Sequence, residues 1–323
     1  NLQAKIDDWH IKNKGKEIKL QEYKKFLKEI GYLKEEGPDF KIETENVDEE
    51  IKRIAGPQLV VPIMNARYTL NAANARWVSL YDSLYGTNII ESDEGGSERY
   101  DPLRGQEVIK YVREFFDKFI PIEGTSWKNI AALKVINKDL VILKDGDEEQ
   151  LKEKNKFIGH RGDANKPTAI IIQNNNLHFE IIINPKAFSA AHDIAGISDV
   201  IAESAISTIC DNEDSVAAVD ANDKIVCYKN WLGLMKGNLK IQFEKNGKNL
   251  ERKLNPDRSY ISKDGKGLKL HGRSLLLIRN VGHLMTNPSI LLKNGDEVPE
   301  GIMDAFITTA SPLPDFKRKK NSR

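Results

Sequence analysis

Cysteine is scarce in this sequence. Its 323 residues include only two, Cys210 and Cys227, too few for a disulfide framework, although one pair could bridge. A reducing, cytoplasmic location is therefore expected. Long apolar runs are lacking as well, since none approaches the ~20 residues that a membrane span requires. Residues 1–16 lack the basic-then-apolar plan of a signal peptide, so no membrane partner is expected.

An excess of one charge is missing too. Lys and Arg number 49 against 48 Asp and Glu. No overall field therefore attracts nucleic acid or anionic lipid, and an anionic ligand must be held by local cations. The basic stretch 317–320 is interpreted as a solvated loop, not a nucleic-acid patch. With 40% hydrophobic and 30% charged residues, the composition indicates a globular chain of one large domain or two ordinary ones.

The first 56 residues have a helical and then a polar pattern. Apolar residues at helical spacing predict two helices within 2–33, separated by a lysine-rich break at 12–19. The acidic stretch 34–56 is predicted to be an extended linker.

Two later segments have the pattern of a short buried strand followed by a helix. The first runs from the apolar stretch 59–64 into helical spacing that ends at Gly86. The second runs from a strand at 205–210 to a helix that ends at Gly237. Repeated units of this kind predict a parallel sheet covered by helices.

A third unit begins at 275–278, four aliphatic residues that are expected to form a strand buried on both faces. The strand ends on Arg279, and its helix is expected at 298–310. In a (β/α)₈ barrel the chemistry sits at the carboxyl ends of strands, which predicts a catalytic or anion-binding role for Arg279. The alternative is a capping arginine that forms a salt bridge with a neighbouring loop, and the pattern alone leaves both open.

The stretches between these units look different. Residues 87–197 contain an amphipathic helix and two hairpin patterns, which turn at 137–139 and 174–176. Residues 238–269 contain another hairpin pattern. Antiparallel hairpins between parallel-type units predict an inserted α/β module.

Four long segments carry a family resemblance. They are 55–90, with "LVVPIMNARYTLNAANARW", 157–181, with "FIGHRGDANKPT", 197–225, with "AISTICDNEDS", and 270–290, with "LHGRSLLLIRNVGHLM". Together they resemble malate synthase, specifically the long bacterial G isoform.

The resemblance implies an α/β fold in which an N-terminal helical clasp precedes a (β/α)₈ TIM barrel. An inserted α/β domain interrupts the barrel, and a helical plug follows it. Family members are more than twice as long, so this chain is expected to hold an N-terminal portion with roughly three of eight barrel units. The implied domains are the clasp and linker at 1–56, the partial barrel at 57–86, 198–237 and 270–323, and the insertion at 87–197 and 238–269.

The implied activity is that of the glyoxylate cycle enzyme, which condenses acetyl-CoA with glyoxylate and hydrolyses the thioester to malate and CoA. A carboxylate base removes a proton from the acetyl methyl group, and Mg²⁺ polarises the aldehyde. A cation must stabilise the charge on the thioester oxygen, and a guanidinium with fixed donors suits that role. The resemblance implies that Arg279 is this catalytic residue and also contacts glyoxylate.

Further residues are implied to bind acetyl-CoA, whose phosphates call for cations. Each has an ordinary alternative: a helix-entry salt bridge for Arg67, core packing for Val60 and Tyr68, and a solvated basic face for Arg252. The implied acetyl-CoA residues are Val60, Arg67, Tyr68, Ser215 and Arg252.

The loop "DNEDS" at 211–215 groups three carboxylates and a hydroxyl. It is not a calcium loop, because the glycine that such a loop needs at its sixth position is missing. A solvated acidic turn is the plain alternative. The resemblance implies that Glu213 and Asp214 face the active site, with Glu213 near the water shell of the metal. His283 is interpreted as a structural, hydrogen-bonding histidine.

The carboxylates that bind Mg²⁺ and the catalytic aspartate lie further along the family's chain, so no metal ligand is assigned here. This chain alone is therefore expected to be inactive. Its expected partners are acetyl-CoA, glyoxylate and the missing C-terminal half, in an enzyme that is monomeric when complete. Two alternatives stay open: a non-catalytic half of a split enzyme that acts as a binding or assembly module, and another CoA-dependent aldolase or lyase on a similar barrel.

Overall fold

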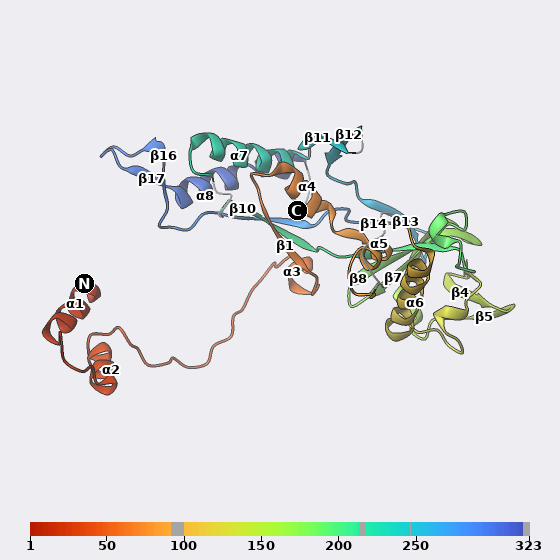
Figure 1. Cartoon of the computed structure of the whole chain (residues 1–323), viewed down its shortest axis with the longest axis horizontal. Coiled ribbons are helices and arrows are strands. Elements are labelled where there is room, and N and C mark those ends of the chain that lie inside the picture. The colour runs from red at the N-terminus through yellow and green to blue at the C-terminus, as the bar shows by residue number, and fades with distance from the viewer. Residues whose placement is uncertain (92–99, 213–217, 246, 319–323) are drawn as a thin grey trace. The chain divides into compact units, whose positions relative to one another are not determined.

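The structure is a computed structural model that describes residues 1–91, 100–212, 218–245 and 247–318. The chain divides into two compact units, Asn1–Val47 and Asp48–Arg323 (Figure 1). Among the described residues the secondary structure is a mixture of helices and strands, in agreement with the predicted α/β class.

The unit Asn1–Val47 contains the two helices that the apolar spacing predicts. They are joined by aromatic side chains: the ring of Trp9 lies 4.5 Å from that of Tyr23 and 5.6 Å from that of Phe26. Such contacts supply much of the packing in a unit this small. The helices are α1 (Leu2–Lys12) and α2 (Leu20–Glu29).

The second unit contains a three-stranded parallel sheet in which β10 is the middle strand. The strands pair in register, so that Pro62, Asp211 and Arg279 stand side by side at the carboxyl ends. All three strands are predicted from the sequence, and their parallel pairing confirms the interpretation of the strand–helix units. They are β1 (Gln58–Pro62), β10 (Ser207–Asp211) and β15 (Leu275–Arg279).

The prediction that β15 is buried on both faces is wrong. Its aliphatic residues are only partly buried and Arg279 is exposed, because β15 pairs with β10 on one side and with no described strand on the other. Side chains alternate between the two faces of a strand. Cys210 and Ile278 belong to the helix-covered core, so Val60 and Leu277, one position away in register, point to the opposite, open face.

Helices α4 and α7 pack on the covered face, and α8 and α9 contact α7. The side chain of Asn65 caps α4 by accepting the N–H of Tyr68, and Gly237 ends α7 with a φ of 69°. The bounds are α3 (Glu49–Lys52), α4 (Ala66–Asn74), α7 (Ala221–Lys236), α8 (Glu300–Ala310) and α9 (Leu313–Arg318), with a hairpin of β16 (Thr286–Leu291) and β17 (Glu297–Pro299) before α8.

The helix predicted to run on to Gly86 is interrupted, and this prediction is wrong. After α4 the chain forms a short strand, β2 (Trp77–Ser79), and a new helix, α5 (Leu80–Tyr85). Strand β2 pairs with β9 (Ile197–Glu203), with Trp77 opposite Glu203. A partner about 120 residues away therefore overrides a helical pattern that is locally sound.

A seven-stranded sheet, ordered β14-β13-β6-β7-β8-β9-β2, forms the largest layer, and its described pairs are antiparallel. Helix α6 (Pro102–Phe119) packs on it through Val112 and Phe116, around the buried Trp127. The remaining bounds are β6 (Phe157–Asp163), β7 (Lys166–Asn174), β8 (Leu177–Ile183), β13 (Arg258–Ser262) and β14 (Gly267–Leu270), with the short 3₁₀ helices Trp127–Asn129, Lys154–Lys156 and Phe188–Ala190.

The predicted hairpins are confirmed. Asn137 and Lys138 have positive φ values of 48° and 72°, and Asn175 and Asn176 have 50° and 63°. Two successive positive φ angles are the geometry of the two-residue turns that suit the strand twist. The first turn joins β3 (Ala132–Ile136) to β4 (Asp139–Lys144), which also pairs with β5 (Asp147–Glu149), the second joins β7 to β8, and a separate hairpin consists of β11 (Lys240–Lys245) and β12 (Lys248–Lys253).

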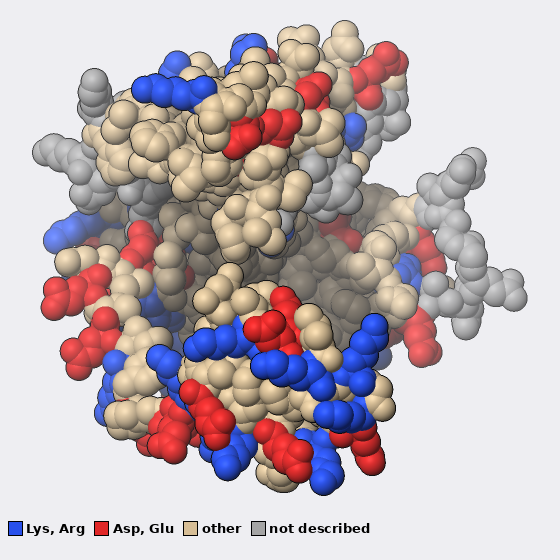
Figure 2. All heavy atoms as spheres, turned by 90° about the vertical axis from the view of Figure 1, so that its left-hand side faces the viewer, with Lys and Arg blue, Asp and Glu red and all other residues tan. Residues whose placement is uncertain are grey.

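One region of the second unit, formed by β16, β17 and α8, has few charged side chains on its surface. In Figure 2 the upper part of the surface, which includes these elements, is mostly uncharged. Leu284, just before β16, and Ile302 and Phe306 of α8 are exposed. An apolar surface of this kind marks a region that another surface can cover. Within the described ranges, no helix is long and apolar enough to cross a membrane.

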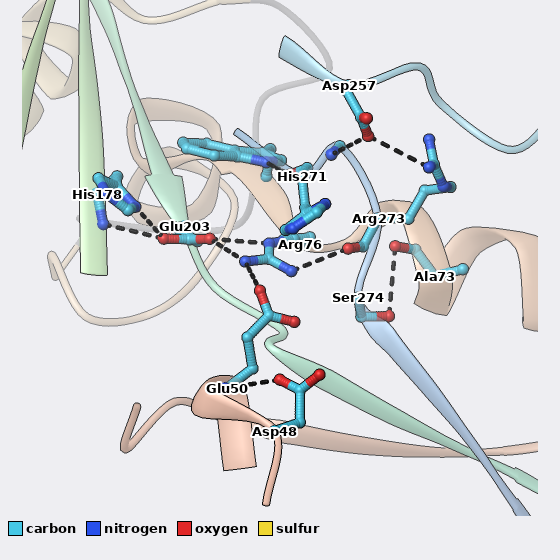
Figure 3. Close-up of polar contacts among 12 residues, drawn as sticks. Asp48, Glu50, Ala73, Arg76, His178, Glu203, Asp257, His271, Arg273 and Ser274 are labelled. Atoms are coloured by element: carbon cyan, nitrogen blue, oxygen red, sulfur yellow. Dashed lines mark hydrogen bonds and ion pairs between the residues drawn. The ribbon is translucent and has the colours of Figure 1, made fainter. Parts of the chain in front are cut away.

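A buried ion cluster links the parallel and antiparallel sheets (Figure 3). Arg76 donates through Nε and Nη2 to Glu203 Oε1, at 2.8 and 2.6 Å, and through Nη2 to Glu50 Oε1 at 2.6 Å. Its Nη1 donates to the carbonyl of Arg273 at 3.0 Å. Burial would raise the pKa of Glu203, but the bond with His178 and the charge of Arg76 outweigh it and hold that pKa below its ordinary value.

The first prediction concerns this cluster. Arg76→Met leaves buried carboxylates without their guanidinium, which we expect to lower the free energy of unfolding by about 3–5 kcal/mol. The matched control is Arg53→Met, because the Arg53–Glu49 pair is exposed, and we expect it to cost about 0–1 kcal/mol. Urea unfolding followed by tryptophan fluorescence measures both. Equal midpoints for the two variants would contradict the assigned role of Arg76.

The second prediction concerns the two thiols, which are buried and free. Burial raises the pKa of Cys210 to about 12 and that of Cys227 to about 11. At pH 8 we therefore expect less than about one thiol in a thousand to be ionised, and hence no reaction of the folded chain with Ellman's reagent. The same chain in denaturant should titrate both thiols. Rapid reaction of either one in the folded chain would show that it is not buried.

Candidate functional site

The candidate site lies at the carboxyl end of the parallel sheet, where an ion pair joins the last residues of two strands. Arg279 Nε donates to Asp211 Oδ1 at 2.8 Å, and its Nη2 donates to Asp211 Oδ2. The carboxylate is buried, whereas 54% of the Arg279 side chain is exposed. A two-point contact of this kind fixes the plane of a guanidinium as well as its position. Arg279 is therefore a held cation with an accessible surface.

The in-register strands explain why this pair forms. Asp211 and Arg279 are paired residues of β10 and β15, so their side chains leave the same face of the sheet. The backbone N–H of Asn212 donates to the carbonyl of Arg279 at 2.9 Å and continues the register by one step. The alternative that Arg279 forms a salt bridge with the neighbouring loop is thus partly correct, because its partner is the last residue of the next strand.

Val60 lies on the same face of the sheet as Arg279, two positions before the carboxyl end of β1. It is 60% exposed, so the alternative that it is core is wrong. Tyr68 is 55% exposed at the start of α4, and core packing is wrong for it too. Both side chains face the surface because each points away from the packed side of its element.

Two of the predicted acetyl-CoA residues come together on one aromatic ring. The guanidinium carbon of Arg67 lies 4.4 Å from the ring centroid of Phe243, and that of Arg252 lies 5.9 Å from the same centroid. Neither arginine forms an ion pair with a carboxylate in the described part of the chain. The helix-entry salt bridge for Arg67 is therefore wrong. Two positive charges that share a ring and have no carboxylate partner keep their N–H donors available to an anion.

The other predicted residues stand apart. Glu213, Asp214 and Ser215 lie outside the described residues. His283 is exposed and makes no hydrogen bond within the described ranges, so the interpretation of a structural histidine is wrong. The turn that follows β15 turns the ring of His283 toward solvent instead of a packed neighbour.

The sequence pattern missed two residues of this site. Asp211 was grouped with an acidic turn, although it ends β10 at the point where Arg279 ends β15; aligning the ends of the predicted strands would have found it. Phe243 lies in "KIQFEK", which gives no signal for a role, because its partners come from α4 and β12. Only the tertiary structure brings them together.

Among the residues that the structure describes, no group of three or more His, Cys, Asp or Glu side chains could hold a metal ion. Mg²⁺ takes one or two carboxylates with water and substrate oxygens. The carboxylate of Asp211 is already engaged by Arg279, so the described residues do not fit a resident Mg²⁺.

A hollow of about 770 Å³ lies elsewhere, at the amino-terminal end of β15, beside Arg76 and Arg273. Arg279 stands at the other end of the same strand. The charges here satisfy one another: Arg273 Nη2 lies 3.2 Å from Asp257 Oδ1, and Arg76 is bound by Glu203. We therefore place the candidate site at the carboxyl end and not at this hollow.

Comparisons with known proteins agree on one family. A family model described as "Malate synthase G, alpha-beta insertion domain" matches residues 100–174. The chain is 49% identical over 328 residues to malate synthase G of Corynebacterium efficiens, across 100% of this chain and 43% of that protein. It is 49% identical over 327 residues to the protein of the same name in Corynebacterium glutamicum, across 100% and 44% of the two chains.

Malate synthase G of Halalkalibacterium halodurans is also 49% identical, over 312 residues that cover 95% of this chain and 43% of that protein. The chain spans less than half the length of these curated relatives. The matches confirm the predicted resemblance: along its whole length the chain is a homologue of malate synthase G, and the match fits an N-terminal fragment of that family's chain.

Proposed function

We propose that this chain supplies part of the active site of a malate synthase, which condenses acetyl-CoA with glyoxylate and hydrolyses the thioester to malate and CoA. The observation that carries the proposal is Arg279 at the carboxyl end of β15, fixed by Asp211 in a chain homologous to malate synthase G. A cytoplasmic location and the glyoxylate cycle are part of the same proposal.

Arg279 is proposed to stabilise negative charge in the reaction. Removing a proton from the acetyl group places charge on the thioester oxygen, and donors fixed in advance stabilise such charge best. Asp211 holds Nε and Nη2 in one plane, so the guanidinium does not have to reorient as the charge forms. The same side chain is proposed to contact the carboxylate of glyoxylate, because a guanidinium suits a carboxylate geometrically.

The acetyl-CoA site is proposed to run from Val60 past Tyr68 to Arg67 and Arg252. The two guanidiniums on Phe243 supply charge for the phosphates of CoA, and the exposed Val60 and Tyr68 offer apolar contact. Ser215 belongs to the proposed acetyl-CoA site, and Glu213 and Asp214 to the surrounding active site. The catalytic base and the carboxylates for Mg²⁺ would come from other parts of the enzyme.

The fold proposal is that β1, β10 and β15 are three strands of a (β/α)₈ TIM barrel. The parallel register, the helices on one face and the accessible Arg279 at the carboxyl ends support it. The proposed domains are a clasp and linker at 1–56, barrel parts at 57–86, 198–237 and 270–323, and an insertion at 87–197 and 238–269.

A second candidate, a binding or assembly module for a separate polypeptide that carries the rest of the enzyme, is favoured by one observation. The open face of the parallel sheet includes Val60, which is apolar and exposed. A partner that covers this face would bury that surface. Turnover by the 323-residue chain alone in a thiol-release assay would exclude this candidate, and co-elution with the remaining part of a malate synthase G would support it.

The third prediction tests the CoA site. Arg67→Met removes a charge-assisted contact to a phosphate, and we expect CoA to bind about tenfold more weakly, as calorimetry measures directly. Phe243→Ala should weaken binding in the same direction, because both guanidiniums lose their common support. Arg53→Met serves as the control, since Arg53 already pairs with Glu49 on the surface. Identical CoA affinities for Arg67→Met and Arg53→Met would remove Arg67 from the site.

The fourth prediction tests Arg279 in a complete enzyme, made by continuing this chain with the remainder of a malate synthase G. Lysine keeps the charge but cannot make the two-point contact with Asp211. For Arg279→Lys we expect kcat to fall about a hundredfold or more, with little change in the KM for acetyl-CoA. Arg53→Lys is the matched control. Full activity of Arg279→Lys would refute the role of a fixed guanidinium.

A further inference from the structure

Residues 280–282, which directly follow Arg279, lie against one face of helix α8. The helix presents Gly301, Asp304 and Thr308 to this segment, at positions spaced by three and four residues. This spacing puts the three residues on one stripe of the helix surface. The stripe therefore supports residues 280–282, the segment that follows β15, along its whole length.

Each residue of the stripe contacts the segment. Asp304 Oδ2 accepts the backbone N–H of Val281 at 3.0 Å. Thr308 Oγ1 lies 3.1 Å from Asn280 Oδ1 and 2.8 Å from the carbonyl of Asp304. Because a hydroxyl both donates and accepts, the Asn280 amide can bond to it in either orientation.

Gly301 allows the close approach. A Cβ at this position would lie 2.9 Å from the carbonyl oxygen of Val281, a separation at which something must shift. Any larger residue would therefore push the helix and the segment apart.

Helix α7 holds the stripe in place from the other side. Lys224 Nζ lies 3.0 and 3.1 Å from the two carboxylate oxygens of Asp304, and Tyr228 Oη donates to Asp304 Oδ1 at 2.6 Å. Trp231 Nε1 donates to the carbonyl of Thr308 at 3.0 Å. Lys224 and Asp304 are both almost completely buried, and a buried charge is stable only when it is paired and hydrogen-bonded. The position of Asp304 is thus determined by α7.

We infer that Asp304 and Thr308 are positioning residues. They hold the segment 280–282 and thereby set the orientation of Arg279 at the end of β15. Arg279 is held from two sides: the end of β10 binds its guanidinium and its carbonyl, and α8 binds the two residues that follow it. The role of Arg279 in catalysis rests on the proposed function, but the positioning itself does not.

The test compares Thr308→Val, Thr308→Ser and Thr309→Val in the 323-residue chain. Valine has the shape of threonine without the hydroxyl, serine restores the hydroxyl, and Thr309 is the exposed next residue of the same helix. One readout is amide hydrogen exchange of residues 279–283. The other is solvent exchange of the Arg279 Nε–H, observed by NMR and assigned from the signal that Arg279→Lys removes.

For Thr308→Val we expect both exchange rates to rise about fivefold, the effect of one lost hydrogen bond of ordinary strength. Thr308→Ser should restore them, and Thr309→Val should leave them unchanged. Asp304→Asn should raise them further, because its amide group places a donor against either Lys224 or Val281. The Arg279 signal separates positioning from loss of overall stability, which the melting temperature of each variant records.

Exchange rates in Thr308→Val equal to those in Thr309→Val would overturn the inference, and this comparison stands even if Asp304→Asn does not fold. Failure of the proposed function is a different result. It would appear as full activity of Arg279→Lys in the complete enzyme, whatever the exchange rates are. The two claims can therefore fail independently.

Discussion

The pairing of Arg279 with Asp211 depends on the register of three parallel strands. Side chains alternate along a strand, so a shift of one residue between β10 and β15 would turn one partner toward the helices and the other away from them. The apolar residues between the ends exclude that shift, because Cys210 and Ile278 must both face the core. Core packing therefore fixes the geometry of a charged pair at the edge, and the candidate site is a consequence of the register.

Buried charge is used at both ends of this sheet, in different ways. At the amino end, Arg76 is surrounded by Glu203, Glu50 and the carbonyl of Arg273. Its charge therefore interacts with groups of the protein itself and joins two sheets. At the carboxyl end, Arg279 is fixed by Asp211 while about half of its side chain stays exposed. A cation that is fully enclosed by acceptors stabilises a fold, whereas one that is fixed but accessible can bind a ligand. This difference, more than the size of the adjacent hollow, is the reason that we propose a structural role for Arg76 and a functional role for Arg279.

The sequence predicted those features of the structure that depend on residues close together in the chain. The apolar strands, the turns at 137–139 and 174–176 and the position of Arg279 at a strand end could all be found from short stretches of sequence. The break between α4 and α5 could not be found in this way. It occurs because Trp77, which fits the helical pattern, pairs as a strand residue with the distant Glu203. Phe243 could not be found either, since its role comes from arginines on two other elements. The exposure of β15 was not predicted for a related reason. A run of aliphatic residues indicates a strand that can be buried, but it does not show whether other elements pack on both of its faces.

The open face of the sheet bears on the chemistry as well as on the fold. Val60 is largely exposed and Leu277 is only partly buried on the face from which Arg279 emerges. A guanidinium beside water interacts with a nascent negative charge through a high effective dielectric, and the same contact becomes several times stronger when water is excluded. A fixed donor is most effective in catalysis inside such a dry site. Whatever covers Val60 and Leu277 would therefore contribute twice, through the groups it adds and by making the charge of Arg279 effective.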